Sequence, residues 1–111
     1  MKKAIIVEGK TDREKLLKVL KEPVDIICTY GTINLTELEK ILDEDLYTEV
    51  YVLVDADEAG TKLRKNIKQL FPNFRHIYTK KMYREVASTP SEELARILHH
   101  AHFEVVGEFS V

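Results

Sequence analysis

Acidic residues stand directly after two apolar segments of this sequence, where their side chains could act together. Glu8 follows the apolar run 4–7, and Asp55 and Asp57 follow the run 50–54. Carboxylates about 4 Å apart repel by roughly 1–4 kcal/mol per pair, so such a group needs a proton or a cation to compensate it. Hard oxygen ligands of this kind suit Mg²⁺, which also binds phosphate oxygens. These residue types therefore indicate metal-assisted phosphoryl transfer.

The spacing of these residues supports this interpretation and also leaves a simpler one open. Asp55 and Asp57 are two residues apart, so in an extended segment their side chains share a side. Gly9 and Gly60 lack a Cβ and would let a phosphate or a backbone segment approach closely. A carboxylate after a strand also often caps the next helix. From these residues alone, capping and metal binding both remain possible.

The elements that must position the acids follow from the apolar pattern. Continuous apolar runs bounded by polar residues are typical of strands that are buried on both faces. We expect strands at residues 4–7, 24–28, 50–54 and 74–78. The tail 103–111 is apolar enough for a terminal strand.

Helical spacing of apolar residues separates these strands. Thr11 and Glu14 match a capping box at the start of the first helix, and Asn34 is a candidate N-cap for the second. A third helix is expected over 61–70, with Leu70 on the inward face and Arg64 on the basic outward face. The segment 89–92 predicts the start of a last helix.

This alternation of strands and helices predicts an α/β fold with a mainly parallel sheet. Right-handed crossovers place the carboxyl ends of all its strands at one edge, where such folds bind ligands. If the first and third strands are neighbours, in the order 2-1-3-4, then Glu8, Asp55 and Asp57 converge. We therefore expect one Rossmann-like domain over residues 1–111, with the acids at its functional edge.

Composition limits the classes of protein that fit. The chain has 111 residues, 32% of them charged, a net charge of −2 and one cysteine, which excludes an internal disulfide. No apolar run approaches the ~20 residues needed to span a bilayer, and the N-terminus lacks the apolar core of a signal peptide. We expect a cytoplasmic protein without a membrane partner. The weak negative charge disfavours purely electrostatic binding of nucleic acid.

The two acidic segments together resemble the signature of the Toprim family. Residues 5–10 read IIVEGK and residues 52–60 read VLVDADEAG, so Glu-Gly follows one strand and D-x-D another, with a glycine after it. The family takes in topoisomerases, bacterial primases, nucleases and the maturation nucleases of 5S ribosomal RNA. Those maturases look most similar, since Thr29-Tyr30-Gly31 and Asn34 match their turn after the second strand, and Glu85 loosely matches a late glutamate.

The resemblance implies a role for each residue of this signature. Asp55 and Asp57 would hold Mg²⁺, or Mn²⁺ in its place, and Glu8 would serve as general acid or base or join the metal ligands. The supporting positions would be Gly9, Gly31, Asn34, Gly60 and Glu85. The residues that would grip nucleic acid, whether RNA or DNA, are Lys10, Arg13 and Lys62, with Lys80, Lys81 and Arg84 as further candidates. For every one of these cations a solvated surface is the competing interpretation.

The implied function is a small Mg²⁺-dependent nuclease or the catalytic module of one. Topoisomerases, primases and RNA maturases carry a further region that selects the substrate, and 111 residues leave no room for one. A protein partner would therefore supply substrate recognition. The alternative is a non-catalytic Toprim-fold adaptor that binds nucleic acid or protein. A receiver-like phosphoacceptor fits less well, because that class usually places paired acids after the first strand.

Overall fold

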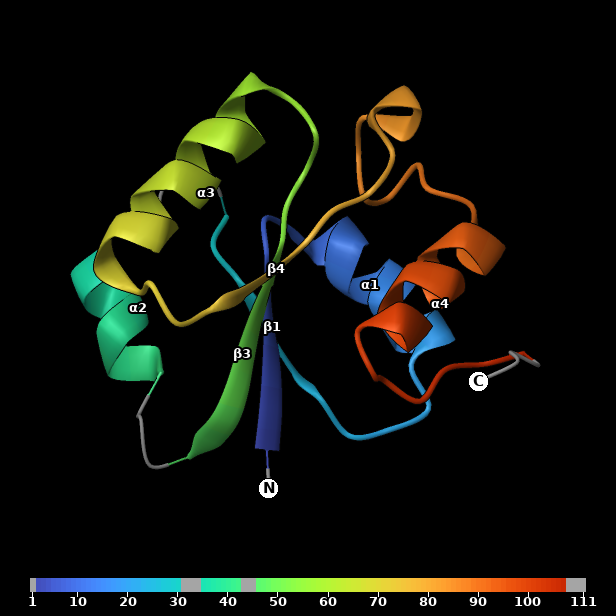
Figure 1. Ribbon diagram of the computed structural model, residues 1–111, viewed down its shortest axis with the longest axis horizontal. Coiled ribbons are helices and arrows are strands. Elements are labelled where there is room, and N and C mark those ends of the chain that lie inside the picture. Colours follow the sequence, from blue (N-terminus) through green and yellow to red (C-terminus); the bar gives the residue numbers. More distant parts are fainter. Residues whose placement is uncertain (1, 31–34, 43–45, 108–111) are drawn as a thin grey trace.

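The computed structural model describes residues 2–30, 35–42 and 46–107 (Figure 1). One four-stranded sheet has the order β2-β1-β3-β4, and every pair in it is parallel. This is the expected 2-1-3-4 order, so the predicted fold is confirmed. The strands are β1 (Lys2–Val7), β2 (Asp25–Cys28), β3 (Tyr47–Leu53) and β4 (Arg75–Ile77). The helices are α1 (Lys10–Val19), α2 (Leu35–Ile41), α3 (Glu58–Leu70), α4 (Ser91–His100) and the 3₁₀ helix η1 (Lys81–Tyr83).

Helices cover both faces of the sheet. Figure 1 shows α2 and α3 on one side and α1 and α4 on the other. Successive side chains of β1 serve the two sides in turn, since Ile5 packs in the core under α1 and α4 while Ile6 packs in the core under α2 and α3. Leu53 and Val52 alternate in the same way along β3. Burial on both faces explains why these strands are continuous apolar runs.

Strand register brings the acidic segments to the same edge. Val7 pairs with Cys28 on one side of β1, and Ile6 pairs with Val52 on the other. Because all strands run in parallel, their carboxyl ends and the residues after them lie together. Glu8 after β1 and the segment from Asp55 after β3 are therefore neighbours, as the sequence predicted.

Two helices begin earlier than predicted. α1 begins at Lys10 with Gly9 as N-cap, and the carboxylate of Asp12 accepts a hydrogen bond from the Gly9 N–H at 3.0 Å. The predicted capping box of Thr11 and Glu14 is therefore wrong, because Asp12 occupies the third helical position instead. α3 begins three residues before the predicted start, at Glu58, with Asp57 as its N-cap.

The orientation of α3 corrects two further predictions. Leu70, expected to face inward, is 58% exposed, and Arg64, expected on the outer face, is 8% exposed. The guanidinium of Arg64 donates to the carbonyl oxygen of Ile77 at 3.1 Å and lies over the ring of Tyr78. The carbonyl groups at the end of β4 and this ring make the burial of a charged side chain possible, and sequence periodicity does not report such partners.

The segment after α4 packs without forming the predicted terminal strand. Phe103 is 2% exposed and meets the ring of Tyr51 edge to face, with centroids 4.7 Å apart. One isolated antiparallel bridge joins Val105 to Leu20. Residues 103–107 therefore cover the core under α1 and α4 as irregular chain, and residues 108–111 lie outside the described part.

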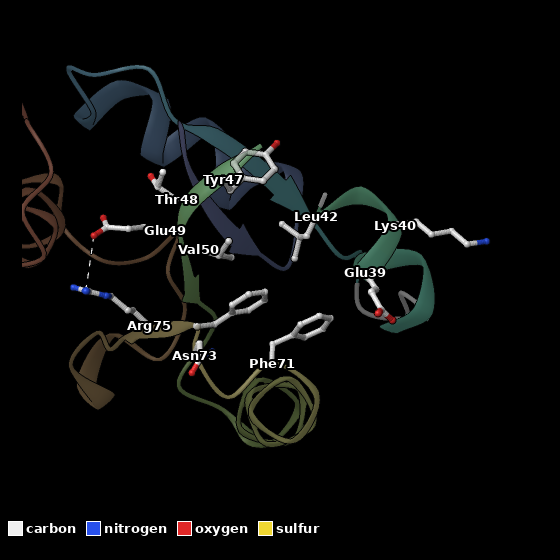
Figure 2. A pocket seen from close by; sticks show the side chains of 11 residues that line it. Glu39, Lys40, Leu42, Tyr47, Thr48, Glu49, Val50, Phe71, Asn73 and Arg75 are labelled. Carbon is white, nitrogen blue, oxygen red and sulfur yellow. Dashed lines mark ion pairs between the residues drawn. The ribbon is translucent and has the colours of Figure 1, made fainter. Parts of the chain in front are cut away.

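A hollow of about 860 Å³ lies at the opposite edge of the sheet from the acidic segments (Figure 2). The start of β3, the end of α2 and the loop before β4 line it, with the stacked rings of Phe71 and Phe74 among its walls. Glu49 and Arg75 form an ion pair at its rim. This hollow shares no wall with the acids. No helix within the described ranges is long and apolar enough to cross a bilayer.

Candidate functional site

The carboxyl group of Glu8 lies against the start of the segment that follows β3. Its Oε2 accepts a hydrogen bond from the backbone N–H of Asp55 at 2.9 Å. Burial, together with the charges of Asp55 and Asp57, raises the pKa of Glu8 to about 7, against the lowering effect of the backbone hydrogen bond. Without a cation, Glu8 therefore holds a proton for part of the time at neutral pH, which is the compensation that clustered carboxylates require.

Asp55 is held between two parts of the chain. Its Oδ1 accepts a hydrogen bond from the Val86 N–H at 2.8 Å, and the next N–H, of Ala56, donates to the carbonyl oxygen of Arg84 at 2.6 Å. These two bonds fasten the segment before α4 to the end of β3. They also bring Glu85, between the two bonded residues, to the edge of the acidic site.

Asp57 combines both roles that the sequence left open. Its Oδ1 accepts a hydrogen bond from the Gly60 N–H at 2.7 Å and so caps α3. Its charge also acts on Glu8, as the raised pKa of Glu8 records. Capping fixes the position of the Asp57 carboxylate without removing its charge from the site.

The two glycines of the acidic segments differ in what surrounds them. A Cβ on Gly60 would collide with the carbonyl oxygen of Asp55 and would lie 2.9 Å from its carbonyl carbon. A Cβ on Gly9 would meet only Asp12 Oδ2, at the ordinary distance of 3.9 Å, and its φ of −146° suits any residue. Gly60 is therefore needed for the packing of α3 against Asp55, whereas the protein itself has room for a side chain at Gly9.

Asp12 is a further acid at this site that the sequence interpretation missed. It is 6% exposed, and its pKa is raised first by burial and then by the charge of Asp55, with Glu85 contributing. The sequence feature that could have identified Asp12 is its position four residues after Glu8, in the first turn of the helix that begins after Gly9. A helix cap at Thr11 places Asp12 at the first helical position, whereas the observed cap at Gly9 places it at the third, where its carboxylate turns back to the Gly9 N–H.

The chemistry of these donors suits a hard divalent cation. Glu8, Asp12, Asp55 and Asp57 offer only carboxylate oxygens, and no ion pair with a described residue neutralises any of them. Among the described residues, however, no three acidic, histidine or cysteine side chains converge on one ion position. The side chains as they stand supply the charge and the ligand type, and their rotamers would have to close around an ion.

The other candidate residues fall into three groups. Lys10 and Arg13 in α1 and Lys62 in α3 are exposed in the first turns of the helices that follow the acidic segments. Lys80 pairs with Glu93 at 3.4 Å, which gives it a partner away from the acids. Gly31 and Asn34 lie outside the described residues.

Tyr30 projects from the same edge of the sheet. Its ring is 69% exposed and its backbone adopts the left-handed conformation with φ of 52°. The Tyr30 N–H donates to the carbonyl oxygen of Glu8 at 2.6 Å. A non-glycine residue in this conformation costs of order 1 kcal/mol, so the backbone of Tyr30 is held beside that of Glu8 against a local preference.

Comparison with known proteins identifies similar sequences and similar solved structures. The Toprim domain model matches residues 3–86. The uncharacterized protein YusF of Bacillus subtilis is 47% identical over 105 residues, which covers 95% of this chain and 72% of that protein. The structure of a small TOPRIM domain protein from Bacillus stearothermophilus is 48% identical, with a TM-score of 0.88 over 95% of this chain and 89% of that one.

Ribonucleases are also among the similar proteins. Ribonuclease M5 of Mycoplasma capricolum is 39% identical over 74 residues, which is 66% of this chain and 41% of that protein. Ribonuclease M5 1 of Ligilactobacillus salivarius strain UCC118 is 32% identical over 111 residues, which is 97% of this chain and 56% of that protein. The chain thus spans about half the length of these ribonucleases, or less.

Proposed function

Because the chain belongs to the Toprim domain family, we propose that it is a Mg²⁺-dependent nuclease, or the catalytic module of one, and that its substrate is RNA. The observation that carries the proposal is the gathering of Glu8, Asp55 and Asp57 at one edge of the sheet, where Glu8 Oε2 accepts a hydrogen bond from the Asp55 N–H at 2.9 Å. Burial and the two neighbouring acids raise the pKa of Glu8 to about 7. An acidic group that retains a proton near neutrality is one that a divalent cation can stabilise in place of that proton.

The assignment of roles follows the hydrogen bonds of each carboxylate. Asp55 and Asp57 would hold the cation, since backbone N–H groups of Val86 and Gly60 already orient them. When bound, Mg²⁺ would stabilise the negative charge that develops on the phosphate oxygens. Asp12, buried beside Asp55, would orient the backbone of Gly9 rather than touch the substrate.

Glu8 would move the proton in this reaction. A pKa near the working pH makes a carboxyl group an efficient general base or acid. Glu8 would take a proton from the attacking water while the water oxygen bonds to phosphorus. It would then give a proton to the leaving oxygen as the bond between that oxygen and phosphorus breaks. Oε2 is engaged by the Asp55 N–H, so Oε1 is the oxygen assigned to this transfer.

RNA is the favoured substrate because two of the relatives described above are named Ribonuclease M5. Those proteins extend well beyond the region that this chain matches. Selection among RNA substrates would therefore rest on a partner or on the RNA structure itself.

Single-site variants test the proposal. Asp55→Asn keeps an oxygen to accept the bond from the Val86 N–H, so the fold should remain while the charge is lost. We expect cleavage of structured and single-stranded RNA in Mg²⁺ or Mn²⁺ by the unmodified chain, and a loss of about 100-fold or more in Asp55→Asn. Glu39→Gln, an exposed acid on α2, is the matched control and should cleave normally. Undiminished cleavage by Asp55→Asn with an intact fold would reject the assignment.

One observation favours a second function, a non-catalytic adaptor. Within the described ranges no three ligand side chains converge on one position, and Asp57 is already engaged as the cap of α3. An adaptor would bind nucleic acid or protein without turnover. A purified chain that binds RNA but cleaves none in either metal would establish this second function and exclude the first.

A further inference from the structure

A basic pocket of about 570 Å³ opens beside the acidic site, between the segment after β3, the segment after β4 and helix α3. Asp55 and Ala56 belong to its wall, so it is continuous with the acids. The residues that give it its character are Arg64, Lys65, Lys68, Tyr78, Thr79 and Lys81. We refer to it as the basic pocket.

The cations of the basic pocket are not neutralised by the protein. Within the part of the chain that the structure describes, no carboxylate forms an ion pair with Arg64, Lys65, Lys68 or Lys81. Arg64 is 8% exposed, and its guanidinium bonds the carbonyl oxygen of Ile77 at 3.1 Å and Nδ1 of His76 at 3.0 Å. Both partners are uncharged, since the pKa of His76 is lowered to about 4 by burial and by Arg64. The pocket is thus built around a buried positive charge.

Thr79 supplies a second, independent observation that points to a ligand. Its side chain is 8% exposed, lines the pocket, and has an Oγ1 without a hydrogen-bond partner among the described residues. A buried hydroxyl without a partner costs roughly 1–3 kcal/mol, and native proteins seldom leave one unused. A ligand oxygen that accepts from Thr79 Oγ1 would remove that cost.

We propose that the basic pocket binds a phosphodiester group of the RNA strand, next to the phosphate that reacts at the carboxylates. This inference rests on the proposed function and extends it by naming the path of the strand. A phosphate accepts hydrogen bonds from hydroxyl and ammonium donors together, and lysine is a common point-charge partner for it. The strand then runs from Glu8 and Asp55 over the end of β3 and along α3.

The exposure of the lining cations favours a polymer over a small anion. Tyr78, which lines the pocket, is 57% exposed and accepts a hydrogen bond from Lys68 Nζ at 3.1 Å. This bond orients the exposed ammonium group of Lys68. Lys65 and Lys81 also line the pocket and are exposed, so the positive charge is spread over several side chains that a strand could contact.

The test is RNA binding in the absence of any divalent cation. Fluorescence anisotropy with a labelled oligouridylate of about 12 nucleotides, in EDTA, measures binding that neither metal nor cleavage affects. We expect Lys68→Ala and Lys65→Ala each to weaken binding by about five- to tenfold and to reduce the slope of log affinity against log salt by about 0.7. Lys18→Ala, an exposed lysine at the far end of α1, is the matched control and should change neither quantity. Affinity and slope equal to the unmodified chain in both pocket variants would overturn the proposal.

Thr79→Val provides a second test, in which thermal stability and RNA affinity should not fall together. Removal of the unpartnered hydroxyl should leave the melting temperature unchanged or higher, while RNA binding weakens by about three- to tenfold. Thr79→Ser keeps the hydroxyl and should retain the binding, which separates the hydroxyl from the packing of the methyl group. Equal binding by Thr79→Val and the unmodified chain would contradict a role for this hydroxyl.

Two further results would reject the phosphodiester as the ligand. Inorganic pyrophosphate that binds as tightly as the RNA would identify the pocket as a small-anion site. A loss of binding in Tyr78→Leu, with none in Lys65→Ala and Lys68→Ala, would indicate base stacking instead. If the chain never cleaves RNA but still binds it through the basic pocket, this inference holds and the nuclease proposal is rejected. Failure of the binding proposal and failure of the nuclease proposal are therefore distinguishable.

Discussion

The backbone N–H of Asp55 donates to Oε2 of Glu8 at 2.9 Å, and this bond joins two residues 47 positions apart at the carboxyl edge of the sheet. The bond fixes one oxygen of Glu8 and brings its carboxyl group beside the Asp55 side chain. Burial and this neighbouring charge together raise the pKa of Glu8 to about 7. The protonation of Glu8 can therefore be followed through the pH dependence of folding stability.

Glu8→Gln should change how stability depends on pH. The folded chain holds a proton on Glu8 up to a pKa of about 7, against the ordinary value of 4.5, so in EDTA this residue makes the fold less stable as pH rises from 4.5 to 7. Glutamine keeps an acceptor for the Asp55 N–H and cannot ionise. We expect the difference in melting temperature between Glu8→Gln and the unmodified chain to grow in favour of the variant across this window. A constant difference would show that Glu8 does not titrate as described.

Mg²⁺ should reverse that effect if the carboxylates bind it. A ligand that binds only the folded state raises stability in proportion to the logarithm of its excess over Kd. We expect millimolar Mg²⁺ to raise the melting temperature at pH 8 and to have little effect at pH 5, where protons compete. Asp57→Asn should reduce the shift, while Asp25→Asn, an exposed acid on β2, should leave it unchanged. Equal shifts in the two variants would place the ion elsewhere.

His76 should make the stability of the fold depend on pH with the opposite sign to Glu8, and His76→Gln should remove that dependence. Burial and the charges of Arg64 and Lys68 lower the pKa of His76 to about 4 from its ordinary 6.5. The unfolded chain therefore takes up this proton first, so stability is lost as pH falls from 6.5 towards 4. Glutamine can still accept from Arg64 without titrating. Thermal melts of the two proteins should converge at pH 7 and diverge below pH 6, with the variant the less sensitive.

Gly60→Ala and Gly9→Ala form a matched pair. A methyl group at Gly60 collides with the Asp55 carbonyl oxygen, so α3 must shift and the fold should lose about 2–3 kcal/mol. The same change at Gly9 meets only Asp12 Oδ2, at the ordinary distance of 3.9 Å, and should cost less than about 1 kcal/mol. Urea titration of both variants measures the difference. If Gly9 borders the RNA, Gly9→Ala will keep its stability and lose cleavage, whereas equal destabilisation of both would contradict the local geometry.

Phe103→Ala should show that the segment after α4 belongs to the core. Phe103 is 2% exposed and packs on Tyr51, so truncation should cost about 3–5 kcal/mol. Val106→Ala, at a side chain that is 38% exposed, should change stability by less than about 0.5 kcal/mol. Denaturant midpoints for the two variants test this. Similar midpoints would mean that residues 103–107 do not contribute to folding stability.

Part of this protein could be predicted from its sequence, because the relevant physics acts between near neighbours. Apolar runs and helical spacing determined the order of elements, and the handedness of crossovers then placed Glu8 and Asp55 at one edge. These rules do not by themselves fix the order of the strands, and the structure confirms the assumed order β2-β1-β3-β4. The predicted starts of α1 and α3 are too late by two and three residues, since Gly9 and Asp57 rather than later residues cap them.

Only the tertiary structure decided the electrostatics of the site. The burial of Asp12, the raised pKa of Glu8 and the burial of Arg64 all depend on atoms from other elements. The Val86 N–H that holds Asp55 comes from 31 residues away. Desolvation and charge interactions depend on distances in space, which a one-dimensional pattern does not contain. The sequence therefore placed the acids at one edge, and the packing determined that Glu8 is the one whose pKa rises to about 7.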